Sequence, residues 1–191
     1  MARVVGIGKQ SFEDIRKKDC FYIDKTDFIK DWWESADDVT LITRPRRFGK
    51  TLNMDMLKCF FSNQYEGRKE LFEGLDIWKD EEYRKLQGTY PVIFLSFAGI
   101  KQTEYSKAVT MIKNEITDIY NKYDYIMKSD LYNDNEKIQF KSVCPDMSDE
   151  IAQKAINDLS NYLSRYYGKK VIIILDEYDT PMQEAYVNGY W

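Results

Sequence analysis

The sequence predicts a three-layer α/β fold, in which helices flank both faces of a parallel β-sheet. Short apolar runs rich in β-branched residues alternate along the chain with longer segments of helical periodicity. The runs are residues 39–43, 91–97 and 171–175, and the clearest helical segments follow the first two of them. Buried parallel strands have continuous apolar sequences, and strand–helix alternation places helices on both sides of such a sheet.

Before the first of these strands, the sequence indicates two short helices. Ser11 is a good helix cap, and we expect a helix at 12–18. A brief strand is expected at 21–23. A second helix is predicted at 27–34, where Thr26 or the residue after it supplies the cap.

The remaining elements follow from apolar spacing. Residues 52–61 keep helical spacing directly after the first strand, and residues 105–123 form the clearest amphipathic helix. Residues 124–146 are rich in Asp, Asn, Lys and Tyr, and we expect them to be an exposed excursion. A last long helix is predicted at 148–166.

A phosphate-binding loop is predicted where the first strand ends. Residues 39–51 read Val-Thr-Leu-Ile-Thr-Arg-Pro-Arg-Arg-Phe-Gly-Lys-Thr, so an apolar run leads into Gly49, Lys50 and Thr51. Such a loop needs inward-pointing backbone N–H groups, a Lys for the β- and γ-phosphates and a hydroxyl for Mg²⁺. Lys50 and Thr51 fill the last two places.

This loop departs from the motif G-x-x-x-x-G-K-[ST] at its first glycine. The chain has Arg44 followed by Pro45, which has no N–H for a phosphate and pushes Arg44 toward extended backbone. A basic surface turn before a helix is therefore an alternative reading of this segment taken alone.

A second motif supports the phosphate loop. Residues 171–175 are five consecutive apolar residues, predicted to be a strand buried on both faces, and Asp176 and Glu177 follow directly. In P-loop enzymes the first such acid holds Mg²⁺ and a neighbouring Glu can polarise the attacking water. A core strand that exits into a polar turn is the alternative, which the pairing of the two motifs disfavours.

Three segments together resemble a known family. They are Phe21-Tyr22-Ile23-Asp24-Lys25-Thr26, Arg44-Pro45-Arg46-Arg47-Phe48-Gly49-Lys50-Thr51 and Leu175-Asp176-Glu177-Tyr178-Asp179-Thr180-Pro181. They are similar, in this order, to the motifs of the bacterial AAA-ATPase-like family, and the resemblance extends from about Gly6 to Pro181. That family carries Arg-Pro where other P-loops have glycine.

The resemblance implies a P-loop NTPase of the additional-strand class. We expect residues 1–191 to form a single domain that is truncated at its C-terminus. Two further strands would follow the Asp-Glu strand, one of them inserted between it and the P-loop strand and carrying a polar sensor residue. Full-length members of the family often continue into a PD-(D/E)XK nuclease-like domain.

The predicted site has three parts. Thr51 and Asp176 would hold Mg²⁺, Glu177 would orient water, and Lys50 would serve both binding and catalysis. The residues expected to bind the nucleotide are Arg46, Arg47, Phe48, Gly49, Lys50, Thr51 and Leu52.

Composition excludes several classes of function. A net charge of −4 argues against a general nucleic-acid or acidic-membrane surface. The chain has no histidine and three widely spaced cysteines, Cys20, Cys59 and Cys144, which disfavours a structural zinc site and indicates free thiols in a reducing cytosol. With no signal peptide and no apolar run of about 20 residues, we expect a soluble, cytoplasmic protein.

We expect an ATP-binding module that uses Mg²⁺ and, in its full-length form, hydrolyses ATP to ADP and phosphate. One alternative is a phosphoryl transferase, in which an acceptor hydroxyl replaces water. Another is a regulatory or scaffold module that binds nucleotide without turnover. The sequence leaves the oligomeric state open.

Overall fold

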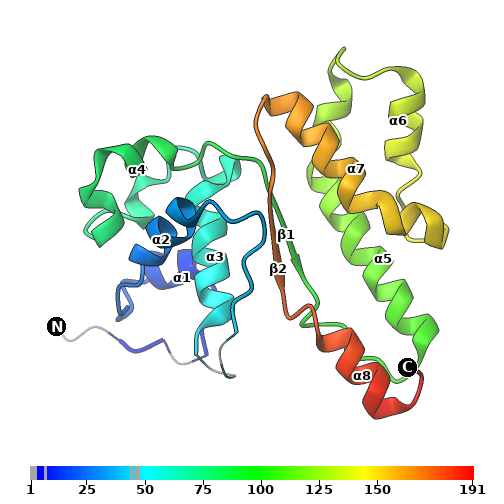
Figure 1. The fold of residues 1–191 in the computed structure, drawn as a ribbon, viewed down its shortest axis with the longest axis horizontal. Coiled ribbons are helices and arrows are strands. Elements are labelled where there is room, and N and C mark those ends of the chain that lie inside the picture. The colour runs from blue at the N-terminus through cyan, green and yellow to red at the C-terminus, as the bar shows by residue number, and fades with distance from the viewer. Residues whose placement is uncertain (1–3, 7, 44, 46–47) are drawn as a thin grey trace. The chain divides into compact units, whose positions relative to one another are not determined.

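The computed structural model describes residues 4–6, 8–43, 45 and 48–191, and this part of the chain has a mixed α/β fold (Figure 1). The chain divides into two compact units, Met1–Val92 and Ile93–Trp191. Within the described residues, the sheet has two neighbouring strands, β1 (Val92–Ser96) and β2 (Ile172–Asp176), which run parallel. No helix in this described part is long and apolar enough to cross a membrane.

The first unit is helical, and α3 is its central element. Figure 1 shows α1 and α2 beside α3. The α-helices of this unit are α1 (Phe12–Lys17), α2 (Asp27–Ser35), α3 (Lys50–Phe61) and α4 (Glu81–Leu86). Its 3₁₀ helices are η1 (Asn63–Tyr65), η2 (Lys69–Leu71) and η3 (Asp76–Lys79).

Aromatic rings join these helices. Phe72 stacks on Phe12 of α1 with ring centroids 5.2 Å apart, and it meets Phe60 of α3 edge-on at 5.1 Å. Trp33 of α2 stacks on Phe61 of α3 at 5.3 Å. Each such ring pair adds about 1 kcal/mol to the stabilisation that burial provides. The helices predicted at 12–18, 27–34 and 52–61 are therefore confirmed, and their apolar faces meet in one core.

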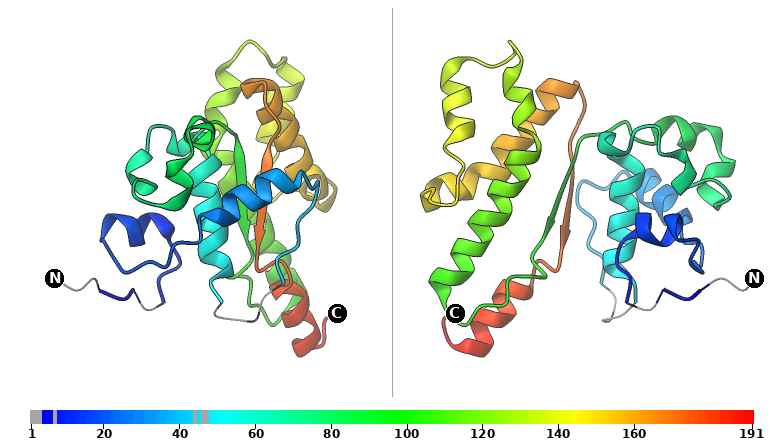
Figure 2. Two further views of the ribbon diagram at one scale, coloured as in Figure 1. Left: turned by 60° about the vertical axis from the view of Figure 1, so that its left-hand side comes forward. Right: turned by 180° about the vertical axis from the view of Figure 1, so that it is seen from behind.

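The second unit places helices beside the two strands (Figure 2). Ile93 and Leu95 of β1 belong to one apolar cluster with buried residues of the two long helices, including Ile116 and Leu159. The helices of this unit are α5 (Tyr105–Lys122), η4 (Asp124–Lys128), α6 (Asp134–Lys141), α7 (Asp149–Tyr167) and α8 (Thr180–Asn188).

The interpretation of residues 124–146 as an exposed excursion is wrong. These residues supply η4 and α6, and Ile126 and Phe140 are buried in the apolar cluster. The hydroxyl of Tyr132 donates to the backbone carbonyl of Tyr162 at 2.6 Å. The prediction fails because the few apolar side chains here are separated by polar residues, and only their contacts with distant helices show that they are core.

The strand predicted at 39–43 is not present among the described residues. These residues form neither a strand nor a bridge, and Val39 and Leu41 are 87% and 62% exposed. A β-branched run has strand propensity, but a strand also needs a neighbour that accepts its ladder hydrogen bonds. The expected strand at 21–23 is likewise reduced to a single bridge between Val5 and Phe21.

The strand β2 is confirmed, but it is not buried on both faces. Ile174 and Asp176 are buried, whereas the intervening side chains of Ile173 and Leu175 are 44% and 42% exposed. Successive side chains of a strand point to opposite faces, so one face of β2 is open. The prediction fails because the sheet is small, with only β1 beside β2 in the described residues.

Candidate functional site

The residue directly before α3 has a left-handed backbone. Gly49 has φ 77°, a left-handed conformation, and α3 starts at Lys50. A Cβ at position 49 would meet no atom of the described residues within 4 Å, so the observed reason for glycine is the backbone conformation. No side chain among the described residues caps this helix, and its first turn carries no acidic residue.

The start of α3 directs donors outward. The first N–H to find an intrahelical acceptor is that of Asn53, which donates to the carbonyl of Gly49 at 2.9 Å. The N–H groups of the residues before it, such as Lys50 and Leu52, lie in the first turn, where helix geometry provides no carbonyl four residues back within the helix. Together with the helix dipole, they make this end attractive to an anion.

Buried polar contacts hold α3 in place. A carboxylate oxygen of Asp55 accepts a hydrogen bond from the backbone N–H of Phe12, the first residue of α1, at 2.7 Å. Asp55 also pairs with Lys58 one turn further along. The hydroxyl of Tyr22 lies 3.2 Å from the sulfur of Met56, and burial raises the pKa of Tyr22 to about 12, so this hydroxyl stays protonated.

The segment Tyr22 to Thr26 binds η3 through side-chain hydrogen bonds. Asp24 accepts hydrogen bonds from the backbone N–H and hydroxyl of Thr26 at 2.9 and 2.7 Å, and from the N–H of Asp76 at 2.7 Å. The Thr26 hydroxyl accepts from the N–H of Ile77 at 3.1 Å. The side chains of Asp24 and Thr26 thus hold the first turn of η3 in place.

These contacts also set the protonation of Asp24. Its partial burial raises the pKa, but the hydrogen bonds from Thr26 and Asp76 outweigh that effect, and the pKa lies below the ordinary value. The carboxylate is therefore the form that the folded unit stabilises.

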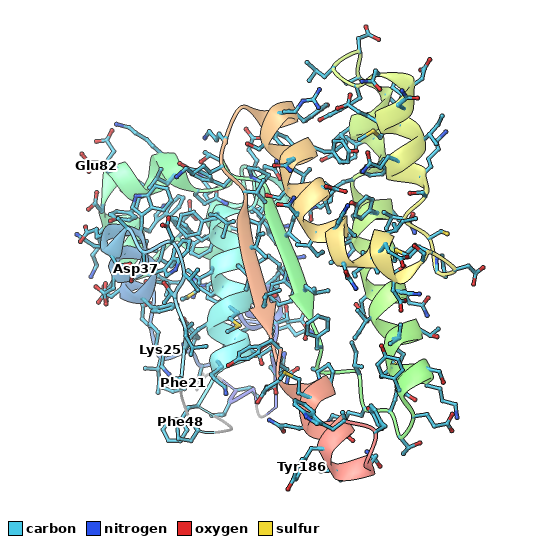
Figure 3. All side chains as sticks on the ribbon, turned by 45° about the vertical axis from the view of Figure 1, so that its right-hand side comes forward. Phe21, Lys25, Asp37, Phe48, Glu82 and Tyr186 are labelled. Carbon is cyan, nitrogen blue, oxygen red and sulfur yellow. The ribbon has the colours of Figure 1, made fainter. Side chains whose placement is uncertain are left out.

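The other residues predicted to bind nucleotide differ in how exposed they are, and two of them are not described. Phe48 is 62% exposed, and Figure 3 shows its side chain at the outer edge of the unit, which is compatible with a backbone contribution. Leu52 is half-buried on α3. Arg46 and Arg47 lie outside the described residues.

The second group of predicted residues lies at the carboxyl end of β2. Asp176 is the last residue of the strand and is 2% exposed. Its backbone carbonyl accepts from the N–H of Phe97 at 2.9 Å, which continues the ladder with β1. A carboxylate oxygen of Asp176 accepts a hydrogen bond of 3.4 Å from the hydroxyl of Ser96, the last residue of β1.

Glu177 has an unusual backbone. Its φ is 51°, in the left-handed region, where a residue with a Cβ is strained by about 1–2 kcal/mol. The turn is closed by a hydrogen bond of 3.0 Å from the N–H of Thr180 to the carbonyl of Glu177. Asp19 and Ala36 share this left-handed backbone, so the conformation is compatible with a functional role for Glu177 but is not specific to one.

The two groups of predicted residues sit in different compact units. Gly49, Lys50, Thr51 and Leu52 share one turn of the first unit, and Asp176 and Glu177 share one strand end of the second. A site shared by Thr51 and Asp176 stays a prediction. Their hydroxyl and carboxylate oxygens are hard ligands that suit Mg²⁺, and the donors at the start of α3 suit phosphate.

Sequence reasoning missed Ser96 and α8. A signal for Ser96 was present, because the carboxyl ends of parallel strands meet at one edge of a sheet and Ser96 ends an apolar run, as Asp176 does. For α8, Pro181 in the first turn was a usable sign of a helix start.

Comparison with known proteins gives one family. A family model described as "Predicted AAA-ATPase" (AAA-ATPase-like) matches residues 6–190. An "Uncharacterized protein in vnfD 5'region" of Azotobacter chroococcum mcd 1 is 28% identical over 177 residues. The match covers 92% of this chain and 29% of that protein, so the chain spans less than a third of the relative's length. No solved structure matches the chain.

Proposed function

Because this chain belongs to the AAA-ATPase-like family, we propose that it is an ATP-binding P-loop module whose full-length form hydrolyses ATP to ADP and phosphate. The observation that carries the proposal is the left-handed Gly49 directly before a helix that starts with Lys50 and Thr51. A glycine turn, helix N–H groups and a Lys at the helix start are the parts from which phosphate-binding loops are built.

Binding is assigned to the first unit. The N–H groups of the turn and of the first residues of α3 donate to phosphate oxygens, and Lys50 adds a charge-assisted hydrogen bond to the β- and γ-phosphates. The expected contributions of Arg46 and Arg47, next to the turn in sequence, belong to the same proposal.

Turnover is assigned to residues of both units. Thr51 of the first unit and Asp176 of the second would hold Mg²⁺, and Ser96 orients the Asp176 carboxylate. When bound, Mg²⁺ would neutralise the negative charge that develops on the phosphate oxygens. Glu177 orients and polarises the attacking water. Its position directly after Asp176 at the end of β2 supports this role.

The proposal includes the larger P-loop architecture. In a three-layer fold, further strands would extend the sheet beside β1 and β2. Helices would then cover the open face of β2, where Ile173 and Leu175 are exposed. We further propose that the full-length protein carries additional domains. Resemblance to the family implies that one of them is nuclease-like. Three free cysteines, Cys20, Cys59 and Cys144, support a reducing cytoplasm as its location.

Two measurements on the full-length protein test this function. Equilibrium binding of ATP is measured in Mg²⁺ and in EDTA, and phosphate release is measured in parallel. ATP binding that tightens with Mg²⁺ and is followed by phosphate release supports an ATPase. Binding without phosphate release favours a regulatory module, or a phosphoryl transferase if an acceptor restores turnover. Absence of ATP binding overturns the proposal.

A further inference from the structure

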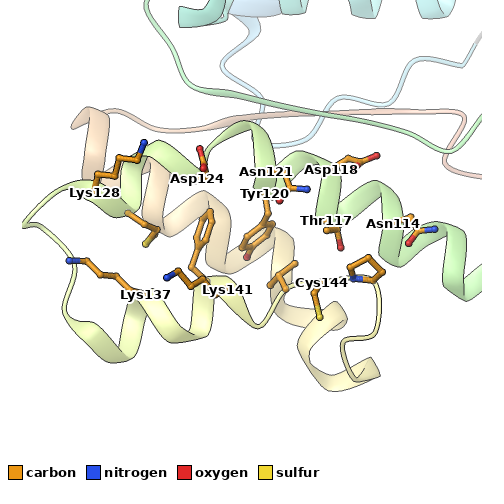
Figure 4. Close-up of a pocket in the computed structure, with 14 residues that line it drawn as sticks. Asn114, Thr117, Asp118, Tyr120, Asn121, Asp124, Lys128, Lys137, Lys141 and Cys144 are labelled. Atoms are coloured by element: carbon orange, nitrogen blue, oxygen red, sulfur yellow. The ribbon is translucent and has the colours of Figure 1, made fainter.

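The second unit contains a cavity of about 850 Å³ between α5, η4, α6 and the segment that leads to α7 (Figure 4). Its lining contains none of the residues assigned above to ATP or Mg²⁺. Pockets that bind small organic molecules have volumes of roughly 300–1,000 Å³, so this one has the size for such a ligand.

The floor of the cavity is apolar and rigid. Tyr120, Met127, Phe140 and Val143 line it, and each is at least 91% buried. The rings of Tyr120 and Phe140 lie 4.6 Å apart, and the Tyr120 hydroxyl donates to the carbonyl of Ala155 at 2.6 Å. A preformed apolar floor with aromatic edges favours a flat or extended apolar body.

One end of the cavity is cationic. Lys128, Lys137 and Lys141 line it together with Asp124, and Figure 4 shows these side chains toward the same end, so positive charge exceeds negative charge there. Elsewhere in this unit, the ammonium groups of Lys107 and Lys113 pair with carboxylates at 2.7 and 2.8 Å. No such ion pair is made by the three cavity lysines within the described residues, so these charges are available for an anionic ligand.

The other end of the cavity carries neutral and acidic hydrogen-bonding groups. Asn114, Thr117 and Asp118 lie there in Figure 4. The Thr117 hydroxyl donates to the carbonyl of Lys113 at 2.8 Å, which leaves its oxygen as an acceptor. The cavity is therefore polarised along its length, because three lysines outnumber the one carboxylate, Asp124, at one end and acceptors line the other end.

We propose that this cavity binds a small organic anion with an aromatic or acyl body. Its carboxylate, sulfonate or phosphate lies among Lys128, Lys137 and Lys141, its body covers Met127 and Phe140, and polar groups at its far end donate toward Asp118. A peptide is disfavoured, because the volume matches one small molecule and the polar groups converge at its two ends. The site is independent of the proposed ATPase function.

The test uses 8-anilinonaphthalene-1-sulfonate, an aromatic sulfonate, as the probe on the whole chain. Fluorescence titration should show one saturable site, and the double variant Lys137→Gln/Lys141→Gln should bind about tenfold more weakly because two charge-assisted contacts are lost. The matched control Lys101→Gln/Lys122→Gln removes two exposed lysines outside the lining and should bind as the wild type does.

A native reporter places the probe in the cavity. Cys144 lines the cavity and is half-buried, whereas Cys20 and Cys59 are 7% and 0% exposed. Saturating probe should therefore slow the alkylation of Cys144 by iodoacetamide. Asn121→Trp, at the exposed rim, should fill the opening and reduce probe binding without removing charge.

Several results would overturn the proposal. The first is probe binding that does not saturate. The second is an equal loss of probe affinity in the cavity double variant and in the control double variant. The third is alkylation of Cys144 that saturating probe does not slow. Displacement of the probe by inorganic phosphate at equal concentration would show that charge alone binds, and displacement only by an acidic amphipathic peptide would indicate a protein partner. Lys50→Ala, which removes the proposed ATP contact, should leave probe binding unchanged.

Discussion

The hydroxyl of Ser96 lies 3.4 Å from a carboxylate oxygen of Asp176, where the neighbouring strands β1 and β2 both end. The N–H of Phe97 donates to the backbone carbonyl of Asp176 at 2.9 Å, so main chain and side chain of this aspartate are both held from β1. A buried carboxylate with a fixed orientation is suited to present an oxygen in one direction.

Ser96→Ala should weaken Mg²⁺-dependent ATP binding without altering binding in EDTA. Loss of a single long hydrogen bond corresponds to about 1 kcal/mol, or roughly fivefold in affinity. Calorimetric titration with ATP in Mg²⁺ and in EDTA separates the metal-dependent part of the affinity from the metal-independent part. Ser106→Ala, an exposed serine on α5, is the control. An equal loss in EDTA would show that Ser96 supports the fold and not the metal site.

Gly49→Ala should destabilise the protein by about 1–2 kcal/mol, because its φ of 77° is strained for any residue with a Cβ. It should also weaken ATP binding, because the turn relaxes away from the phosphate-binding geometry. Gly67→Ala is the matched control, since Gly67 has φ 76° and equally open surroundings. Urea denaturation should give similar losses for both variants, whereas ATP titration should respond to Gly49→Ala alone.

Glu177→Gln should preserve Mg·ATP binding and abolish turnover in the full-length protein, because it keeps the shape and removes the charge that polarises water. Glu177→Gly should also abolish turnover, but it relieves the strain at φ 51° and should raise the free energy of unfolding by about 1 kcal/mol. Phosphate release and urea denaturation report the two effects. Turnover of Glu177→Gln at the native rate would assign water activation to another residue.

Asp24→Asn should lower stability at neutral pH by about 1 kcal/mol, since an amide accepts through one oxygen only and must lose a hydrogen bond to Thr26 or Asp76. The folded-state pKa of Asp24 is lowered, so its stabilisation is complete above the unfolded pKa of about 3.9 and is lost as pH falls through the folded pKa. Urea denaturation should show that the free energy of unfolding differs less between Asp24→Asn and the wild type at pH 3 than at pH 7. Asp31→Asn, on the exposed side of α2, is the control and should leave stability at pH 7 unchanged.

Periodicity predicted most elements of the fold. The helices α1, α2, α3, α5 and α7 and the strands β1 and β2 lie where their apolar spacing and caps place them. Ser11 and Ser148 cap α1 and α7 through their side chains, as local chemistry requires. These features depend on neighbours in sequence, and a single sequence carries that information.

Features that depend on distant partners could not be predicted. Residues 39–43 have strand propensity but no ladder partner in the described residues, and the burial of Phe140 in the core is decided by its contacts with α5 and α7. At the site, Gly49, Lys50 and Asp176 were predicted from motif spacing. The left-handed backbone of Glu177 and the bond from Ser96 follow from how the strands end side by side, which no motif records.

The most direct test of the central claim is equilibrium binding of ATP to the wild type and to Lys50→Ala. Lys50 is the first residue of α3, and the proposed role of its ammonium group is a charge-assisted bond to phosphate. Lys69→Ala, an exposed lysine of the same unit, is the control, and circular dichroism checks that all three proteins fold. We predict a loss of about 2–3 kcal/mol, roughly 30- to 150-fold in affinity, for Lys50→Ala and none for Lys69→Ala. Unchanged ATP affinity in a folded Lys50→Ala protein would contradict the phosphate-binding assignment.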